Sequence, residues 1–169
     1  PIHFRTCWKE ANAGTWKAME EFYQAGKIRS LGISNFRPHH IEALLETATV
    51  APMVNQIRLC PGETQDALVG YCRQHGILPE AYSPLGSGKI FRVPEMQALS
   101  EKYGKSIAQL CIRWCLQMEF LPLPKSVTAE RIRDNAAVFD FELAPGDVNL
   151  ITNLEGCCGY SDDPDTTTF

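Results

Sequence analysis

The sequence predicts an α/β protein with parallel strands, and three observations indicate this fold class. Four short apolar runs alternate along the chain with amphipathic helical segments. A helix follows each run, which is the order that parallel strands with right-handed crossovers require. Polar residues collect where the runs end, and α/β proteins bind their ligands at the carboxyl ends of parallel strands. We therefore expect the functional residues to lie in a row of strand ends.

The element boundaries follow from periodicity and from the positions of proline. Trp16, Met19 and Phe22 fall on one face of the first helix. Pro38 opens the second helix, because a first turn tolerates proline. Pro79 is unexpected, since proline removes a hydrogen-bond donor from a central strand. The strands are predicted at 28–34, 53–57, 77–83 and 120–124. The helices are predicted at 15–26, 38–48, 64–76, 94–104, 106–118, 128–139 and 145–155.

The length indicates a single domain that is part of a barrel. The chain has 169 residues, which is enough for one ordinary domain. An eight-stranded (β/α) barrel typically takes about 250 residues, and four strands do not close one. We predict one partial barrel domain over residues 1–169, about half of a barrel. Residues 156–169 are polar and contain proline, which predicts a loose C-terminal tail.

Composition argues against several classes of partner. The net charge of −4 gives no electrostatic reason to bind nucleic acid or an anionic membrane. No apolar run reaches the roughly 18 residues of a membrane span, and the first residues lack the apolar core of a signal peptide. The seven cysteines are odd in number and irregularly spaced, and Cys111 and Cys115 fall on one apolar helix face. We expect reduced thiols and a cytoplasmic protein, with a metal or disulfide role as the alternative.

Lys125, Ser126 and Arg131 form the clearest candidate site. A Lys and a hydroxyl follow the last predicted strand and precede a helix, whose free N-terminal N–H groups and dipole favour an anion. Arg131, one turn inside that helix, can offer a planar fork to the same phosphate. An alternative stays open, in which Ser126 or Thr128 caps the helix and the two cations are simply solvated.

Four motifs in order give the sequence a resemblance to a known family. "GISNF" (32–36), "VNQI" (54–57), "AYSPLGSG" (81–88) and "LPKSVTAERIRDN" (123–135) resemble the aldo-keto reductases, and the similarity runs from about Pro1 to about Phe141. The opening stretch is similar to the small bacterial members. The resemblance implies a (β/α)8 barrel that binds NADPH and reduces carbonyls to alcohols. This chain would cover about the C-terminal half of that barrel.

Carried over motif by motif, the resemblance assigns one group of residues to the nicotinamide. Ser34 and Asn35 would hold the carboxamide, and Gln56 would contact the same group, because an amide needs both a donor and an acceptor. Tyr82 would stack on the ring. Without the resemblance, Ser34 and Asn35 are typical of a turn before a helix, and Tyr82 of ordinary strand packing.

The resemblance assigns a second group to the phosphates and the adenine. Lys125, Ser126 and Arg131 would grip the 2′-phosphate and so select NADPH over NADH. Asp134 and Asn135 would reach the adenine. The pyrophosphate loop would comprise Ser83, Leu85, Gly86 and Ser87. Gly86 would let the backbone approach the phosphates.

The sequence assigns no catalytic residue in this chain. The family uses an Asp, a Tyr, a Lys and a His, with the Tyr as general acid. His3 is predicted to lie in a loop, and His39, His40 and His75 lie on helix patterns away from the strand ends. We expect the cofactor-binding half of an NADPH-dependent reductase of aldehydes and ketones, whose substrate the sequence does not name. The main alternative is a non-catalytic half-barrel that holds NADP(H) or forms a homodimer through its exposed edges. A different phosphate-binding barrel enzyme is a third hypothesis.

Overall fold

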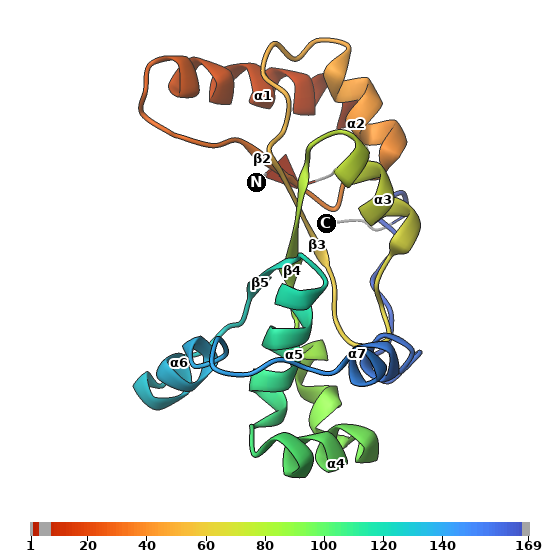
Figure 1. Cartoon of the computed structure of the whole chain (residues 1–169). Helices are drawn as coiled ribbons and strands as arrows, with labels where there is room; N and C mark the ends of the chain where they lie inside the picture. Colours follow the sequence, from red (N-terminus) through yellow and green to blue (C-terminus); the bar gives the residue numbers. More distant parts are fainter. Residues whose placement is uncertain (1, 4–7, 167–169) are drawn as a thin grey trace. The chain divides into compact units, whose positions relative to one another are not determined.

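The computed structural model describes residues 2–3 and 8–166, and it divides the chain into two compact units (Figure 1). The first unit comprises residues 1–57, 66–79 and 161–169, and the second comprises residues 58–65 and 80–160. None of the described helices combines the length and the apolar character that crossing a membrane requires. Each unit is described below by itself.

The first unit has parallel strands with helices between them. Its elements are β1 (Ile2–His3), α1 (Trp8–Gln24), β2 (Gly32–Ser34), α2 (Pro38–Leu45), β3 (Val54–Arg58) and α3 (Asp66–Gln74). β2 pairs with β1 and with β3, both in parallel. The register sets Ser34 level with Gln56, and His3 level with Ser34. Residues that were predicted at strand ends therefore lie at one edge of this unit.

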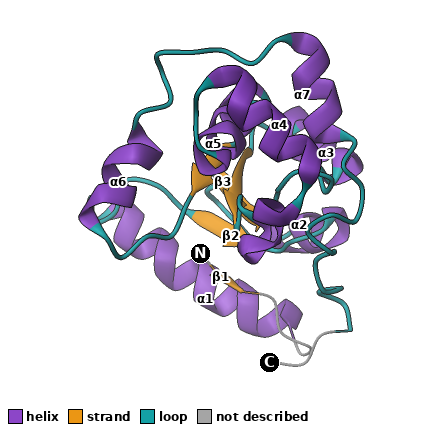
Figure 2. Cartoon of the chain, turned by 90° about the horizontal axis from the view of Figure 1, so that it is seen from below, coloured by secondary structure: helices purple, strands orange, loops and turns teal. Residues whose placement is uncertain are grey.

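The second unit follows the same alternation. Its elements are β4 (Leu78–Tyr82), whose first two residues belong to the first unit, the 3-10 helix η1 (Gly86–Arg92), α4 (Pro94–Tyr103), α5 (Ile107–Gln117), β5 (Leu121–Leu123), α6 (Ala129–Ala136) and α7 (Pro145–Thr152). β4 and β5 are parallel, with Tyr82 level with Leu123. A long loop joins α6 to α7 (Figure 2). The α/β class with parallel strands is confirmed.

Several predicted boundaries were wrong, and one strand was missed. The structure has a fifth strand, β1, because its two residues are too few to show a period. His3 lies in this strand and not in a loop. α1 begins at Trp8 and not at Thr15. Gly14 is exposed and does not interrupt the helix, and no atom of the described residues would contact a Cβ at this position. Pro79 is buried within β4, where Leu78 donates its N–H to the Met53 carbonyl at 2.9 Å.

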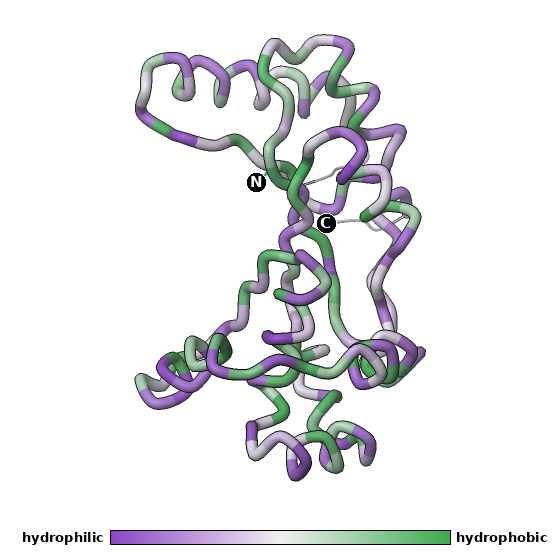
Figure 3. The backbone as a smooth tube through the Cα atoms, in the orientation of Figure 1, coloured by the Kyte–Doolittle hydropathy of each residue, from purple (hydrophilic) through white to green (hydrophobic). Residues whose placement is uncertain are grey.

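The core of the first unit lies between its helices and strands. Trp16 from α1 and Ile41 from α2 are buried there against strand residue Ile33. Both hydrophilic and hydrophobic residues occur along α1 (Figure 3), and the buried Trp16 and Glu20 lie four positions apart, on one face of the helix. Trp16 also donates its indole N–H to the Val50 carbonyl at 3.0 Å. Glu20, buried one turn later, accepts the Val50 N–H at 2.7 Å, so α1 fixes the loop before β3.

α5 forms the centre of the second unit. Ser106 caps its N-terminus by accepting the Gln109 N–H at 3.2 Å, while the Gln109 side chain accepts the Ser106 N–H at 3.0 Å. Cys111, Trp114 and Cys115 are fully buried on its inner face. The described cysteines are all free, and burial raises the pKa of both thiols on α5. Cys111 and Cys115 therefore act as small apolar residues, as predicted.

Replacing Glu20 should test how much the loop contact stabilises the first unit. Glu20→Ala leaves the N–H groups of Thr49 and Val50 without their carboxylate acceptor, and we expect a loss of about 2 kcal/mol in the free energy of unfolding. Urea denaturation measures it. Glu21→Ala is the matched control, because Glu21 is exposed. Equal losses in the two variants would show that the buried carboxylate has no special role.

Candidate functional site

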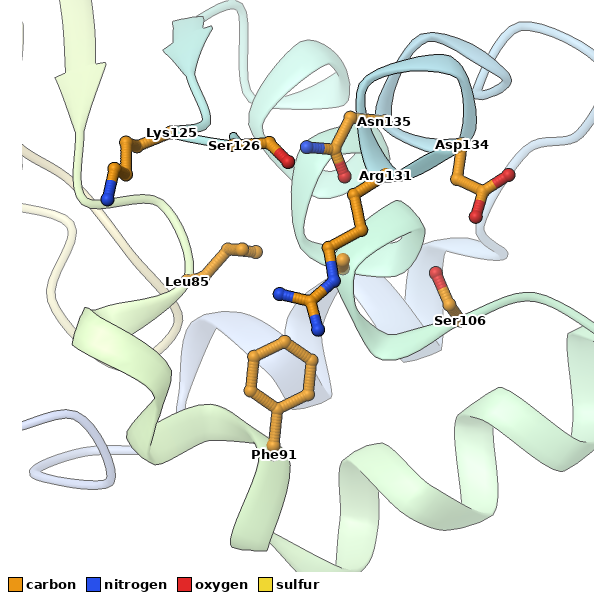
Figure 4. Close-up of a pocket in the computed structure, with 9 residues that line it drawn as sticks. Leu85, Phe91, Ser106, Lys125, Ser126, Arg131, Asp134 and Asn135 are labelled. Atoms are coloured by element: carbon orange, nitrogen blue, oxygen red, sulfur yellow. The ribbon is translucent and has the colours of Figure 1, made fainter. Parts of the chain in front are cut away.

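A pocket of about 440 Å³ lies in the second unit, where the predicted phosphate residues come together (Figure 4). Six of its lining residues were predicted: Leu85, Lys125, Ser126, Arg131, Asp134 and Asn135. They come from the segment after β4, from the end of β5 and from α6. The register of β4 and β5 explains this convergence, because parallel strands release their following segments at the same edge.

The N-terminus of α6 opens without a side-chain cap. Thr128 occupies the N-cap position with an extended backbone, but its hydroxyl accepts no helix N–H. The Ser126 hydroxyl makes a long contact of 3.5 Å with the Thr128 carbonyl, so it does not cap the helix either. The capping alternative is therefore not what the structure shows. The first N–H groups of α6 remain available to an anion.

The two cations of the pocket make no polar contact with the described residues. Neither Lys125 nor Arg131 has a hydrogen-bond or ion-pair partner within the described part of the chain. The Arg131 guanidinium points from α6 toward the ring of Phe91, and Asp134 lies on the opposite side of the pocket from Lys125 (Figure 4). Both side chains are exposed, as the solvated-cation alternative expects. Two unpaired cations beside free N–H groups are nevertheless the arrangement that binds a phosphate.

Three lining residues were missed by the sequence analysis: Phe91, Ser106 and Ala108. Phe91 is 44% exposed, so part of its ring is accessible at the pocket. It belongs to η1, and no motif marks it. Ser106 could have been anticipated as an N-cap, because Gln109 follows three residues later. Its position beside the pocket could not, since that depends on how α5 packs against α6.

The predicted pyrophosphate loop does not line this pocket apart from Leu85. Ser83 and Ser87 adopt left-handed backbone conformations, with φ of 51° and 53°. Gly86 is buried, and a Cβ placed on it would overlap Cys158. Arg58 holds that cysteine in place by donating to its carbonyl at 2.7 Å. The structure thus gives Gly86 a packing reason that is separate from approach to a phosphate.

In the first unit, the predicted nicotinamide residues form a tight turn after β2. The Ser34 hydroxyl and the Asn35 N–H both donate to the Gln56 carbonyl, each at 3.0 Å. Asn35 has a φ of 58°, a left-handed backbone conformation that asparagine adopts more readily than most other residues. The Asn35 side chain has no hydrogen-bond partner in the described residues. The turn therefore presents a half-buried amide that is free to bind a ligand.

Asn55 holds the same turn, and the sequence analysis did not find it. Its side-chain N–H donates to the Phe36 carbonyl at 2.8 Å, and its oxygen accepts the Phe36 N–H at 3.4 Å. Asn55 is fully buried, so this pair of bonds satisfies an amide that would otherwise be costly. An Asn inside a predicted apolar strand, directly before Gln56, was the available signal.

One cluster in the first unit has metal-ligand residue types. Ligand atoms of His39, His40 and Asp165 lie within 4.8 Å of one another. The His40 Nδ1 accepts the Arg37 N–H at 3.0 Å, which places the proton of the neutral ring on Nε2. That Nε2 lies 2.8 Å from Asp165 Oδ1. A metal would need a lone pair on Nε2, so the close contacts of both imidazoles with Asp165 account for this cluster better.

Substitution of Gly86 should separate packing from backbone strain. Gly86→Ala places a methyl group against Cys158 at a φ of 53°, and we expect a loss of about 3 kcal/mol in the free energy of unfolding. Gly88→Ala is the matched control, since Gly88 has φ of 87° but open space around it. It should lose only about 1 kcal/mol. Thermal denaturation of both variants checks this, and similar losses would refute the packing role.

Stability should depend on pH through His40. Burial, followed by the nearby His39, lowers its pKa to about 4 from 6.5, against the opposing pull of Asp165. Between those values the unfolded chain binds the extra proton. The free energy of unfolding should therefore fall as the pH drops from 6.5 to 4, by up to about 3 kcal/mol. His40→Gln should flatten this slope in denaturation curves, whereas His75→Gln at an exposed helix end should preserve it.

Comparison with known proteins identifies the family. The family model "Aldo/keto reductase family" matches residues 2–155. The chain is 42% identical over 161 residues to "Glyoxal reductase" of Bacillus subtilis, covering 95% of this chain and 58% of that protein. It is also 42% identical over 154 residues to "Uncharacterized oxidoreductase YtbE" of the same organism, covering 91% of this chain and 55% of that protein.

Solved structures agree with the sequence matches. A mutant of Gox0644 crystallised in complex with NADPH has a TM-score of 0.92 at 34% identity, covering 99% of this chain and 62% of that one. An aldo/keto reductase from Brucella melitensis has a TM-score of 0.81 at 37% identity, covering 87% and 56%. The chain thus spans between half and two thirds of the length of these relatives. It has the α/β barrel-type fold of these proteins, and it belongs to the aldo/keto reductase family.

Proposed function

We propose that this chain is the NADPH-binding half of a reductase that converts aldehydes or ketones to alcohols. One observation carries the proposal: Lys125 and Arg131 face a pocket at the uncapped end of α6 and have no partner in the described residues. A 2′-phosphate would supply the missing negative charge, and its oxygens would accept hydrogen bonds from the free N–H groups. NADPH carries such a phosphate, whereas NADH does not.

Each part of the chain would bind or orient a different part of the cofactor. Lys125 and Ser126 would hold the 2′-phosphate with Arg131, whose guanidinium already extends into the pocket. Asp134 and Asn135 would contact the adenine. In the first unit, the Asn35 amide would pair with the carboxamide of the nicotinamide. The bound cofactor supplies the hydride, and the residues of this chain fix its position.

The turn after β2 suits a carboxamide because its shape is fixed in advance. Ser34 and Asn35 both donate to the Gln56 carbonyl, so the turn does not need to order itself when a ligand binds. The buried Ser34 hydroxyl helps to hold this shape, and the half-buried Asn35 side chain offers both a donor and an acceptor. A fixed turn lowers the entropy cost of binding. Gln56 would contact the same carboxamide, and Tyr82 would stack on the ring.

We further propose that the catalytic tetrad is not carried by this chain. The family resemblance assigns Tyr82 to stacking and Lys125 to the phosphate, so neither is left for proton transfer. The substrate carbonyl would receive its proton from a Tyr on the other half of the barrel. The alternative is a non-catalytic module that holds NADP(H) without turnover.

Dimerisation through β5, the other form of the alternative, meets a physical obstacle. In a parallel strand the N–H and C=O of one residue point to the same side, and the sides alternate. Pro122 cannot donate, so Leu121 and Leu123 supply the bonds to β4, and Phe120, Pro122 and Pro124 face outward. The Phe120 N–H is already bonded to the Cys115 carbonyl at 2.8 Å. Two such edges offer each other acceptors without donors, which disfavours pairing.

Substitution of the two cations tests the cofactor assignment. In Lys125→Ala with Arg131→Ala the affinity for NADPH should fall about 100-fold, because charge-assisted bonds to the phosphate are lost. NADH affinity should change less than about threefold. Isothermal titration calorimetry measures both constants. Arg133→Ala is the control, since Arg133 lies on the same helix but does not line the pocket. Equal losses for the two dinucleotides would contradict the 2′-phosphate assignment.

Turnover distinguishes the reductase half from the module. The purified chain is mixed with NADPH and a reactive aldehyde, and the cofactor absorbance is followed. We expect binding without oxidation by this chain alone. Oxidation would mean that the chain contains a catalytic group, and His3→Ala would then be the first variant to make, because β1 sets His3 level with Ser34. The same assay repeated with the remaining part of a reductase barrel added in trans should restore oxidation if the chain is a reductase half. Continued inactivity would favour the module.

A further inference from the structure

The turn after β2 is held by its neighbours at four consecutive residues. Ser34 and Asn35 are bonded to the Gln56 carbonyl, and the Phe36 backbone is bonded to Asn55. The last position, Arg37, donates its N–H to the His40 Nδ1 at 3.0 Å. The orientation of the His40 ring therefore decides whether the final N–H of the turn is satisfied. His40 is fully buried, so this N–H–imidazole contact is shielded from water.

The C-terminal segment supplies the other side of that imidazole. Asp165 Oδ1 lies 2.8 Å from His40 Nε2 and 3.1 Å from His39 Nε2. The Arg37 guanidinium contacts Asp163 at 2.9 Å and Asp165 at 3.2 Å. Residues 161–166 of the segment that was predicted to be loose thus meet the N-terminal turn of α2 at several points.

The segment is shaped to make these contacts. The Asp163 carboxylate accepts the N–H of Asp165 at 2.9 Å, which forms a local turn around Pro164. Asp163 and Asp165 then both contact Arg37, the N-cap residue of α2, and Asp165 also contacts His39 and His40 in its first turn. Burial acts to raise the pKa of Asp165, but the hydrogen bond with His39 and the nearby positive charges lower it overall. Asp165 is therefore ionised at neutral pH, as a partner for Arg37 and for a protonated Nε2 must be.

We propose that Asp165 is a positioning residue, through which the C-terminal segment fixes the cofactor-binding turn via His40. The chain of contacts runs from Asp165 to His40, from His40 to the Arg37 N–H, and along the turn to Asn35. This role rests on the proposed function for its consequence, which is nicotinamide binding, but not for the contacts themselves. A segment distant in sequence would then set the affinity of the turn for its ligand without touching it.

Hydrogen exchange tests the contacts directly. In Asp165→Ala the His40 ring loses its partner, and the amide of Arg37 should exchange at least about tenfold faster, as followed by NMR. Asp162→Ala is the matched control: it removes the same charge from the same segment, and Asp162 is exposed and has no partner in the described residues. Unchanged exchange at Arg37 in Asp165→Ala would overturn the proposal. Asp165→Asn keeps an acceptor oxygen and should restore most of the protection, and failure of this rescue would overturn the route through His40.

Affinity measurements test the consequence. In Asp165→Ala the affinity for NADPH should fall about fivefold, whereas that for 2′,5′-ADP, which lacks the nicotinamide, should not change. A parallel loss for both ligands would point to general destabilisation and would overturn a positioning role. If wild-type protein binds neither ligand, the proposed function fails, while the exchange result still decides the contacts.

A zinc titration tests whether His39, His40 and Asp165 form a metal site instead. Zn²⁺ should leave the melting temperature of the wild-type protein unchanged, because the proton on His40 Nε2 blocks the ligand position. A zinc-dependent rise in melting temperature that His39→Ala abolishes would show a metal site instead, and it would overturn the positioning role of Asp165.

Discussion

Parallel pairing in register is the constraint on which both candidate sites depend. In the first unit it sets Ser34 level with Gln56, so one carbonyl can accept from the hydroxyl and from the following N–H. In the second unit it sets Tyr82 level with Leu123, so the segments that follow β4 and β5 leave from one edge. A shift of one residue would turn each strand-end side chain to the other face of its sheet. The apolar parts of the strands fix this register, and the register in turn places the polar residues at the strand ends where they can act together.

Much of the fold and part of the site could be predicted from the sequence, because strong local signals coincide with the elements. Pro38 and Ser106 mark helix starts that the structure confirms. The Lys125 and Arg131 pair is visible as two cations that flank a helix start. β1 was missed because a two-residue strand depends on its neighbour and not on its own pattern. Such an element is defined by pairing, which no single stretch of sequence records.

The residues that support the site were harder to predict than the residues that would touch a ligand. Asn55 and His40 were not assigned a role, yet both satisfy backbone groups of the turn after β2. Their partners lie between three and nineteen residues away and are identified only in the folded chain. His40 had been placed away from the strand ends because it lies on a helix. The structure shows that the first turn of this helix directly follows the strand end, so position on a helix was not a reason to exclude it.

Gly86 shows that a motif can be identified correctly while its physical explanation is incomplete. Gly86 was predicted to contact a phosphate, because glycine lets a backbone approach a ligand. The structure gives it a second reason, since Cys158 occupies the space that a side chain would need, and Arg58 prevents that residue from moving away. Both reasons would preserve the glycine, but they differ in what a substitution breaks. Packing against Cys158 is lost whether or not a ligand is present, whereas a phosphate contact matters only in the complex. Stability without ligand therefore distinguishes the two explanations, and affinity alone does not.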